Sequence, residues 1–62
     1  MKLKKYREQY NLSIITIAKT LRVSRQHIYD IEAGKTFPSR TLAKLIERKT
    51  SGQVTARELL GL

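Results

Sequence analysis

The sequence predicts an all-α fold, a compact domain of five short helices over residues 1–62. Apolar residues recur three or four positions apart within short segments, which is the spacing of one helix face. Residues that cap or end helices separate these segments, and no segment alternates polar and apolar residues over the length of a strand. A chain of 62 residues makes one small domain, which buries only about 60% of the surface of its unfolded chain. We therefore expect a single domain of modest stability.

The first helix is predicted over residues 2–10, with the sequence KLKKYREQY. Leu3, Tyr6 and Tyr10 follow one another at i, i+3 and i+7 and make its apolar face, while charged residues fill the other face. Asn11 then tolerates the left-handed backbone conformation that ends a helix. We expect the face with the tyrosines to pack on the core.

Two further helices are predicted over residues 14–21 and 25–33, joined by a tight turn. Ser13 and Ser24 stand directly before them, where a side-chain oxygen can accept a hydrogen bond from the first turn of the helix. Gly34 follows the second of these helices and is free to adopt the positive φ of a helix end. The residues expected to face inward are Ile17, Ala18 and Leu21 on the first helix, Val23 in the turn, and Ile28 and Ile31 on the second helix.

The last two helices are predicted over residues 40–49 and 56–60. Pro38 cannot lie inside a helix, so residues 35–38 form a loop and Ser39 caps the helix that follows. The remaining signals are an apolar face on the fourth helix (Leu42, Leu45 and Ile46), a capping box (Thr55 and Glu58) and a hydrophobic staple (Val54 and Leu59).

The chain is strongly basic, with 13 Lys and Arg against 5 Asp and Glu and a formal net charge of +8. So much positive charge destabilises a compact fold unless a polyanion uses it, and nucleic acid is the polyanion that we expect. The outward face of the helix over 25–33 carries side chains suited to bases. Arg can bind guanine and Gln can bind adenine through two hydrogen bonds, and Asp can accept from cytosine. The candidate base-reading residues are Arg25, Gln26, Tyr29 and Asp30.

The sequence offers no catalytic or metal-binding constellation. Cysteine is absent and His27 is the only histidine, so we expect no disulfide, no metal site and no cofactor. No carboxylate pair, nucleophile–base spacing or phosphate-binding glycine loop indicates an enzyme or a small-molecule substrate. No apolar run reaches the ~20 residues of a membrane span and no signal peptide is recognisable, so we expect a soluble, cytoplasmic protein.

Residues 12–38, LSIITIAKTLRVSRQHIYDIEAGKTFP, resemble the helix-turn-helix of the phage repressor and Cro family, also called the lambda-repressor-like or XRE family. The apolar positions, the serine cap, Glu32 and Gly34 stand at the family's spacing, and the resemblance covers nearly the whole chain. It implies a lambda-repressor-like domain in which the second and third helices form the helix-turn-helix. It further implies a homodimeric Cro-type repressor that reads a palindromic double-stranded DNA operator with the third helix in the major groove.

The resemblance implies base contacts by Arg25 and Gln26 at the start of the third helix. Two alternatives stay open at each of the other candidates. Asp30 either reads cytosine or orients Arg25, and Tyr29 either reaches a phosphate or a thymine methyl or is a half-buried amphipathic residue. The loop after this helix is implied to grip the DNA backbone. The candidate backbone contacts are Ser24, Lys35, Thr36 and Arg40.

The resemblance also implies an ion pair between Arg7 and Glu32, which would fix the third helix against the first. Two positions depart from the family pattern. Arg22 stands where the turn usually has glycine, and a positive φ costs Arg about 1 kcal/mol relative to Gly. Ile14 stands where the family often has a glutamine that contacts a phosphate. Isoleucine cannot donate a hydrogen bond, and it would pack on the stem of Arg25 or on a sugar or thymine methyl.

The end of the chain is expected to form the dimer interface. The helix over 56–60 is too short to cover every leucine near it, so Leu59, Leu60 and Leu62 are the candidates for contact with a second copy. So small a patch predicts a weak homodimer that forms mainly on DNA. The alternative function is an antitoxin-type or other protein-interaction module that also binds DNA, although 62 residues leave no obvious arm for a protein partner.

Overall fold

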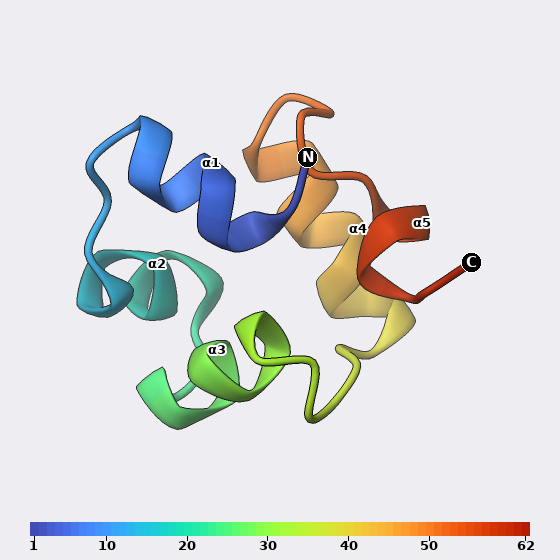
Figure 1. The fold of residues 1–62 in the computed structure, drawn as a ribbon, viewed down its shortest axis with the longest axis horizontal. Helices are drawn as coiled ribbons and strands as arrows, with labels where there is room; N and C mark the ends of the chain where they lie inside the picture. Colours follow the sequence, from blue (N-terminus) through green and yellow to red (C-terminus); the bar gives the residue numbers. More distant parts are fainter.

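The structure is a computed structural model that describes all 62 residues and contains five α-helices and no strand (Figure 1). The predicted all-α fold is confirmed, and each helix end lies within one residue of its predicted position. No helix has the length and apolar character that crossing a bilayer requires. The helices are α1 (Leu3–Gln9), α2 (Ile14–Leu21), α3 (Arg25–Glu32), α4 (Arg40–Lys49) and α5 (Ala56–Leu59).

Side-chain caps begin four of the five helices. Ser13, Ser24 and Ser39 each accept a hydrogen bond at 3.1 Å from the backbone N–H three residues further on. Thr55 accepts from the N–H of Glu58, and the Glu58 carboxylate accepts from the N–H of Thr55, which completes the predicted capping box. Loss of one such cap typically costs about 1 kcal/mol, so these short-range contacts fix where the helices start.

Left-handed backbone conformations end the first three helices. Gly34 follows α3 with a φ of +75°, as predicted, and Asn11 and Arg22 adopt 53° and 58° after α1 and α2. The turn forms around Arg22 without glycine, because the N–H groups of Arg22 and Val23 donate to carbonyls of α2 at 3.2 and 3.0 Å. The departure from the family pattern at this position costs about 1 kcal/mol of strain and leaves the fold intact.

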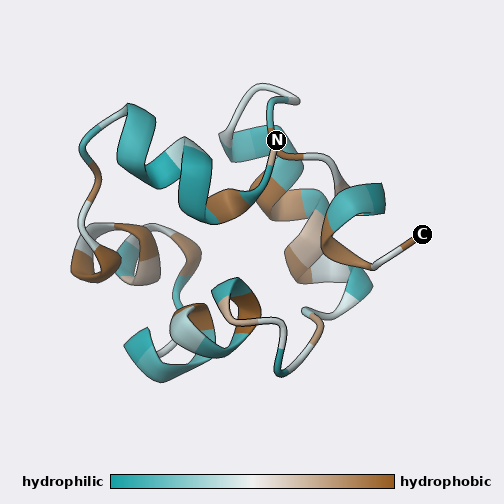
Figure 2. Ribbon diagram, viewed as in Figure 1, coloured by the Kyte–Doolittle hydropathy of each residue, from teal (hydrophilic) through white to brown (hydrophobic).

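The apolar faces of all five helices meet in one core (Figure 2). Ile28, Ile46 and Val54 are the most completely enclosed large side chains, at 0%, 1% and 0% exposure. Burial of each contributes about 1.5–3 kcal/mol relative to an exposed side chain. The core consists of Leu3, Ile14, Ile17, Ala18, Leu21, Ile28, Leu42, Ala43, Ile46, Val54 and Leu59.

Tyr10 lies differently from what the sequence predicts, and the burial of Ile14 bears on its two alternatives. The prediction that Tyr10 continues the apolar face of α1 is wrong, because the helix has ended and the side chain is 46% exposed. Its ring lies on that of Tyr6, with the centroids 4.7 Å apart, and its hydroxyl donates to Gln53 at 3.1 Å. Ile14 is only 8% exposed and belongs to the core, which leaves almost no surface for a sugar or thymine methyl. It borders a shallow hollow that Arg25 also lines, in agreement with the other alternative.

Candidate nucleic-acid interface

The helix pair α2–α3 lies at one edge of the molecule, joined by the turn at residues 22–24 (Figure 1). Ile28 on the inner face of α3 is fully buried against the core that also holds Ile17 and Leu21 of α2. Because its inner face is anchored in this way, α3 presents its outer face to solvent on a fixed support. The exposed residues of that face include Arg25, Gln26 and Tyr29.

The four candidate base-reading residues lie on one side of α3. Arg25, Gln26 and Tyr29 are exposed, and Asp30 is half-buried. Tyr29 keeps 53% of its surface accessible. It lines a shallow hollow between α2 and α3 together with Arg25 and Ile15, which is itself 48% exposed. A cation, an aromatic ring and an aliphatic side chain therefore share one accessible surface.

Asp30 is hydrogen-bonded to Gln26 and not to Arg25. The Nε2 of Gln26 donates to the Oδ1 of Asp30 at 3.0 Å, and Asp30 forms no salt bridge. In this structure Asp30 therefore orients Gln26 and makes no contact with Arg25 through a hydrogen bond or salt bridge. The reason is helical spacing, since residues four positions apart lie one above the other on a helix, whereas Arg25 is five positions away.

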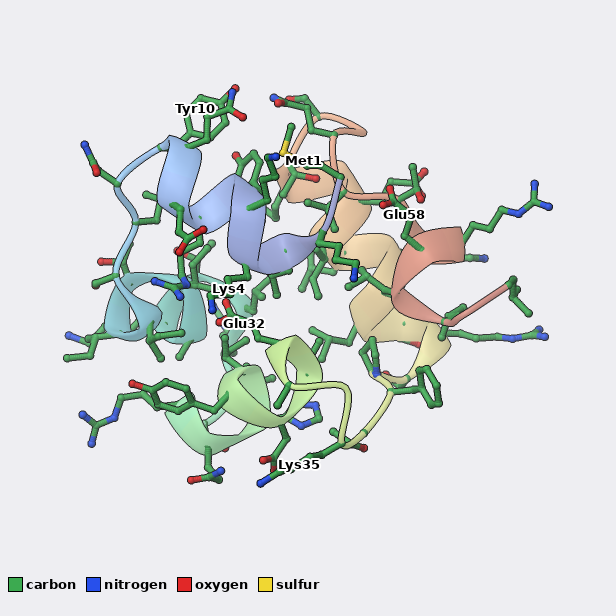
Figure 3. The ribbon with its side chains drawn as sticks, viewed as in Figure 1. Met1, Lys4, Tyr10, Glu32, Lys35 and Glu58 are labelled. Atoms are coloured by element: carbon green, nitrogen blue, oxygen red, sulfur yellow. The ribbon has the colours of Figure 1, made fainter.

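Arg7 and Glu32 form the pair that joins α1 to the last turn of α3. The Nε and Nη2 of Arg7 donate to the two oxygens of Glu32 at 2.9 and 3.1 Å, and the side chains are 19% and 7% exposed. Figure 3 shows Glu32 turned toward the interior from α3. The hydrogen bonds that Arg7 donates to Glu32 are the main reason that the pKa of Arg7 is raised above its ordinary value. The two-pronged geometry fixes both the position and the rotation of α3.

The candidate backbone contacts lie at the two ends of α3, with Ser24 before it and the other three after it. Lys35 points away from the fold at the end of α3 in Figure 3, and Arg40 is also exposed, whereas Thr36 is half-buried. The backbone N–H of Lys35 already donates to the carbonyl of Asp30 at 2.9 Å, so only its ammonium group is free to meet a phosphate. Ser24 is exposed, and its oxygen accepts from the N–H of His27 while its hydroxyl proton remains free to donate.

The carboxylates of the chain neutralise few of its cations. Among the 13 Lys and Arg side chains, only Arg7 takes part in a salt bridge. Glu47 accepts from the N–H of Ala56 at 2.6 Å, and Glu58 is held by the N-terminal amine at 2.8 Å and by the Thr55 hydroxyl at 3.0 Å. These contacts support α5 and leave the cations near α3 unpaired. The positive potential is therefore available to an external polyanion.

A family model described as Helix-turn-helix matches residues 3–51, which contain α1 to α4. The chain belongs to the XRE-type helix-turn-helix family, which is lambda repressor/Cro-like. The helix-turn-helix is formed by α2 and α3. This XRE-type protein is a DNA-binding transcription regulator whose partner is double-stranded DNA, in a family that is generally not enzymatic. No curated protein and no solved structure matches the chain.

Two exposed apolar residues of this XRE-type domain, Ile15 and Phe37, were not predicted from its sequence. Ile15 is the outward member of the three isoleucines of α2, a position that helical spacing alone could have indicated. Phe37 is 67% exposed, and a Cβ added to Gly61 would lie 3.1 Å from its ring. The ring therefore covers the backbone beside Leu62, a contact between distant segments that no local pattern reveals.

The three leucines near the C-terminus have different surroundings. Leu59 is 9% exposed and belongs to the core, so it has almost no surface to offer a second copy of the chain. Its assignment to the dimer interface is therefore corrected. Leu60 is half-buried, and Leu62 is 80% exposed. Both border a shallow groove that is otherwise lined by Ala56 and by the cations Arg40, Lys44 and Arg57.

Proposed function

We propose that this XRE-type protein is a Cro-type repressor that binds a palindromic operator as a homodimer, with α3 in the major groove. The observation that carries the proposal is the two-sided character of α3. Ile28 fixes its inner face at 0% exposure, while Arg25, Gln26 and Tyr29 are exposed on the other side. A major groove about 12 Å wide admits such a helix.

The base contacts follow from the donors and acceptors on this face. Arg25 binds guanine through O6 and N7, and Gln26 binds the adenine edge with Asp30 beside it. Tyr29 and Ile15, exposed at 53% and 48%, provide apolar surface for a thymine methyl or a sugar. Each good two-bond contact is worth about 1–3 kcal/mol of discrimination against the wrong base.

Phosphate contacts on both sides of α3 would set the register on the duplex. The Ser24 hydroxyl lies at the N-terminus of α3, and the side chains of Lys35, Thr36 and Arg40 lie beyond its C-terminus. Hydroxyl, ammonium and guanidinium groups all bind phosphate oxygens irrespective of sequence. These four residues therefore contribute affinity and orientation, while the outer face of α3 contributes specificity.

The dimer interface is proposed to form from Phe37, Leu60 and Leu62. Phe37 and Leu62 are the two most exposed large apolar side chains of the chain, at 67% and 80%. In a two-fold interface each copy would also bring Lys44 and Arg57 toward those of its partner. Repulsion between these cations keeps the dimer weak in free solution, and two half-sites on one duplex would bring the subunits together.

Selection of bound sites from a random-sequence DNA pool tests this function. We expect a palindrome whose half-sites lie about 10–10.5 base pairs apart, centre to centre, because two recognition helices must enter successive major grooves on one side of the duplex. A motif without two-fold symmetry would contradict the homodimer. The recovery of no motif would contradict sequence-specific binding.

A second candidate function, an antitoxin-type module that also binds DNA, is favoured by the groove beside α5. Leu60 and Leu62 offer apolar contact there, while Arg40, Lys44 and Arg57 supply positive charge. An acidic amphipathic segment of another protein complements such a surface. A stable acidic partner that purifies with the chain, and is lost on Arg57→Glu, would support this function over the repressor homodimer.

A further inference from the structure

The hydrogen bond between Gln26 and Asp30 has a consequence for which bases α3 accepts. We infer that the two side chains read DNA as one unit that prefers a base with an exocyclic amino group, adenine first and cytosine second, over the keto bases guanine and thymine. Asp30 is then a positioning and specificity-determining residue. The inference rests on the proposed entry of α3 into the major groove.

The contact fixes which way the amide of Gln26 faces. A carboxylate can only accept hydrogen bonds, so the group 3.0 Å from Asp30 Oδ1 must be the NH2 of Gln26 and not its oxygen. A free glutamine can exchange its donor and acceptor ends by rotation, and this one is held. The pair therefore presents two acceptors to a ligand, Oε1 of Gln26 and Oδ2 of Asp30, together with one remaining N–H donor.

Base edges in the major groove match this arrangement unequally. Adenine offers an N6 amino donor beside the N7 acceptor, so it satisfies both the glutamine oxygen and the remaining N–H. Cytosine offers only its N4 amino donor, which either acceptor of the pair can receive. Guanine and thymine present O6, N7 or O4 acceptors, which would face the oxygens of the pair and the negative charge of Asp30. Desolvation in the groove increases the penalty for such a mismatch.

The charge of Asp30 gives independent support. Glu32, Glu47 and Glu58 are each hydrogen-bonded to groups that hold the fold together, whereas Glu8 and Asp30 are not. Of these two carboxylates only Asp30 lies on the outer face of α3. A negative charge on a surface that approaches phosphates weakens binding to every DNA sequence. Such a charge is useful at this position if it rejects unsuitable bases.

Asp30→Asn removes the negative charge of Asp30 and replaces one acceptor oxygen by a donor, while the size of the side chain stays the same. Glu8→Gln is the matched control. Glu8 is an exposed carboxylate on α1 that forms no salt bridge, so Glu8→Gln removes the same charge away from the outer face of α3. We expect both variants to bind all DNA somewhat more tightly. Only Asp30→Asn should lose the base preference, because an asparagine can donate to the keto oxygens that Asp30 rejects.

The measurement concerns the one operator position at which the wild type shows a base preference and Gln26→Ala does not. Its readout is the affinity for operators that carry each of the four bases at that position. The folded chain should favour adenine over guanine and thymine about 5- to 150-fold at this position, with cytosine between. Asp30→Asn and Asp30→Ala should reduce that ratio to below about threefold, with unchanged circular dichroism. An Asp30→Asn profile identical to that of Glu8→Gln would overturn the inference.

The outcomes also separate this inference from the proposed function. A wild-type protein without sequence preference, or a preference that survives both Arg25→Ala and Gln26→Ala, contradicts entry of α3 into the groove. A preference that depends on Arg25 and Gln26 but is unchanged by Asp30→Asn contradicts the inference alone. A preference for guanine or thymine at the Gln26 position contradicts it as well.

Discussion

Arg7→Ala should destabilise this XRE-type domain far more than the loss of any other single cation. The substitution leaves Glu32, which is 7% exposed, as a buried carboxylate without its partner. Removal of one member of a buried ion pair costs about 3–5 kcal/mol, and because Arg7 itself retains 19% exposure we expect about 3 kcal/mol. A chain of 62 residues has a total stability of roughly 3–9 kcal/mol, so the loss is a large fraction of it.

Thermal and urea unfolding followed by circular dichroism measures this effect. A loss of about 3 kcal/mol corresponds to a Tm lower by roughly 12–24 °C for a domain of this size. Arg7→Lys should fall between Arg7→Ala and the wild type, because an ammonium keeps the charge but not the two-pronged contact. Lys5→Ala is the control, since Lys5 is exposed on the same helix and forms no salt bridge. If Arg7→Ala lost no more than the ~0.5 kcal/mol of an ordinary surface substitution, the pair would not hold α3 to α1.

Three further predictions concern salt, the dimer and pH. If each subunit neutralises about four phosphates, the logarithm of the DNA-binding constant should fall with the logarithm of the salt concentration at a slope near −7. Lys35→Ala should flatten this slope by about one per subunit for all sequences alike. A slope that Lys35→Ala leaves unchanged would show that Lys35 does not contact phosphate. The double substitution Phe37→Ser and Leu62→Ser should weaken binding to a full palindrome but not to a single half-site, with helicity unchanged. An equal loss of affinity for the palindrome and for the half-site would place the dimer interface elsewhere. The N-terminal amine and then the Thr55 hydroxyl lower the pKa of Glu58, so its stabilising contribution is present above its ordinary pKa and is lost as pH falls through the lowered value. Melting temperatures from pH 6 to 3 should therefore fall less steeply for Glu58→Gln, and identical pH profiles would contradict this assignment.

Helix boundaries could be predicted because the signals that set them are local. Ser13, Ser24 and Ser39 cap helices within three residues of themselves, and Asn11 and Gly34 end them through their own backbone preferences. No knowledge of the rest of the fold is needed for these assignments.

Side-chain surroundings were predicted less well where they depend on distant segments. Tyr10 has helical spacing from Leu3, but the helix ends before it and the residue meets Gln53 instead. The sequence assigns Leu59 both to a hydrophobic staple and to the dimer interface, and the core encloses it, whereas Leu62 remains 80% exposed. The burial of each depends on how α5 packs on α4, which the local pattern does not specify.

The candidate site could be predicted in part, better than the distant side-chain contacts but less completely than the helix boundaries. The outward face of α3 follows from helical spacing once Ile28 is placed inside. The same spacing favours Gln26 over Arg25 as the partner of Asp30, although both were within reach by sequence distance alone. The surroundings of Phe37 could not have been found in this way, because its neighbour Gly61 is distant in the sequence, near the C-terminus.

The central claim is that the outer face of α3 reads base sequence, and binding by Arg25→Ala and Gln26→Ala tests it most directly. The assay compares affinity for the selected operator with affinity for scrambled DNA of the same length at one salt concentration. We predict that each substitution reduces the ratio of the two affinities by about 5- to 150-fold, while helicity stays close to that of the wild type. Loss of the Arg25 charge also weakens binding to scrambled DNA, and the ratio of the two affinities corrects for that loss. A ratio that survives both substitutions would contradict the account, because another surface of the domain would then read the DNA.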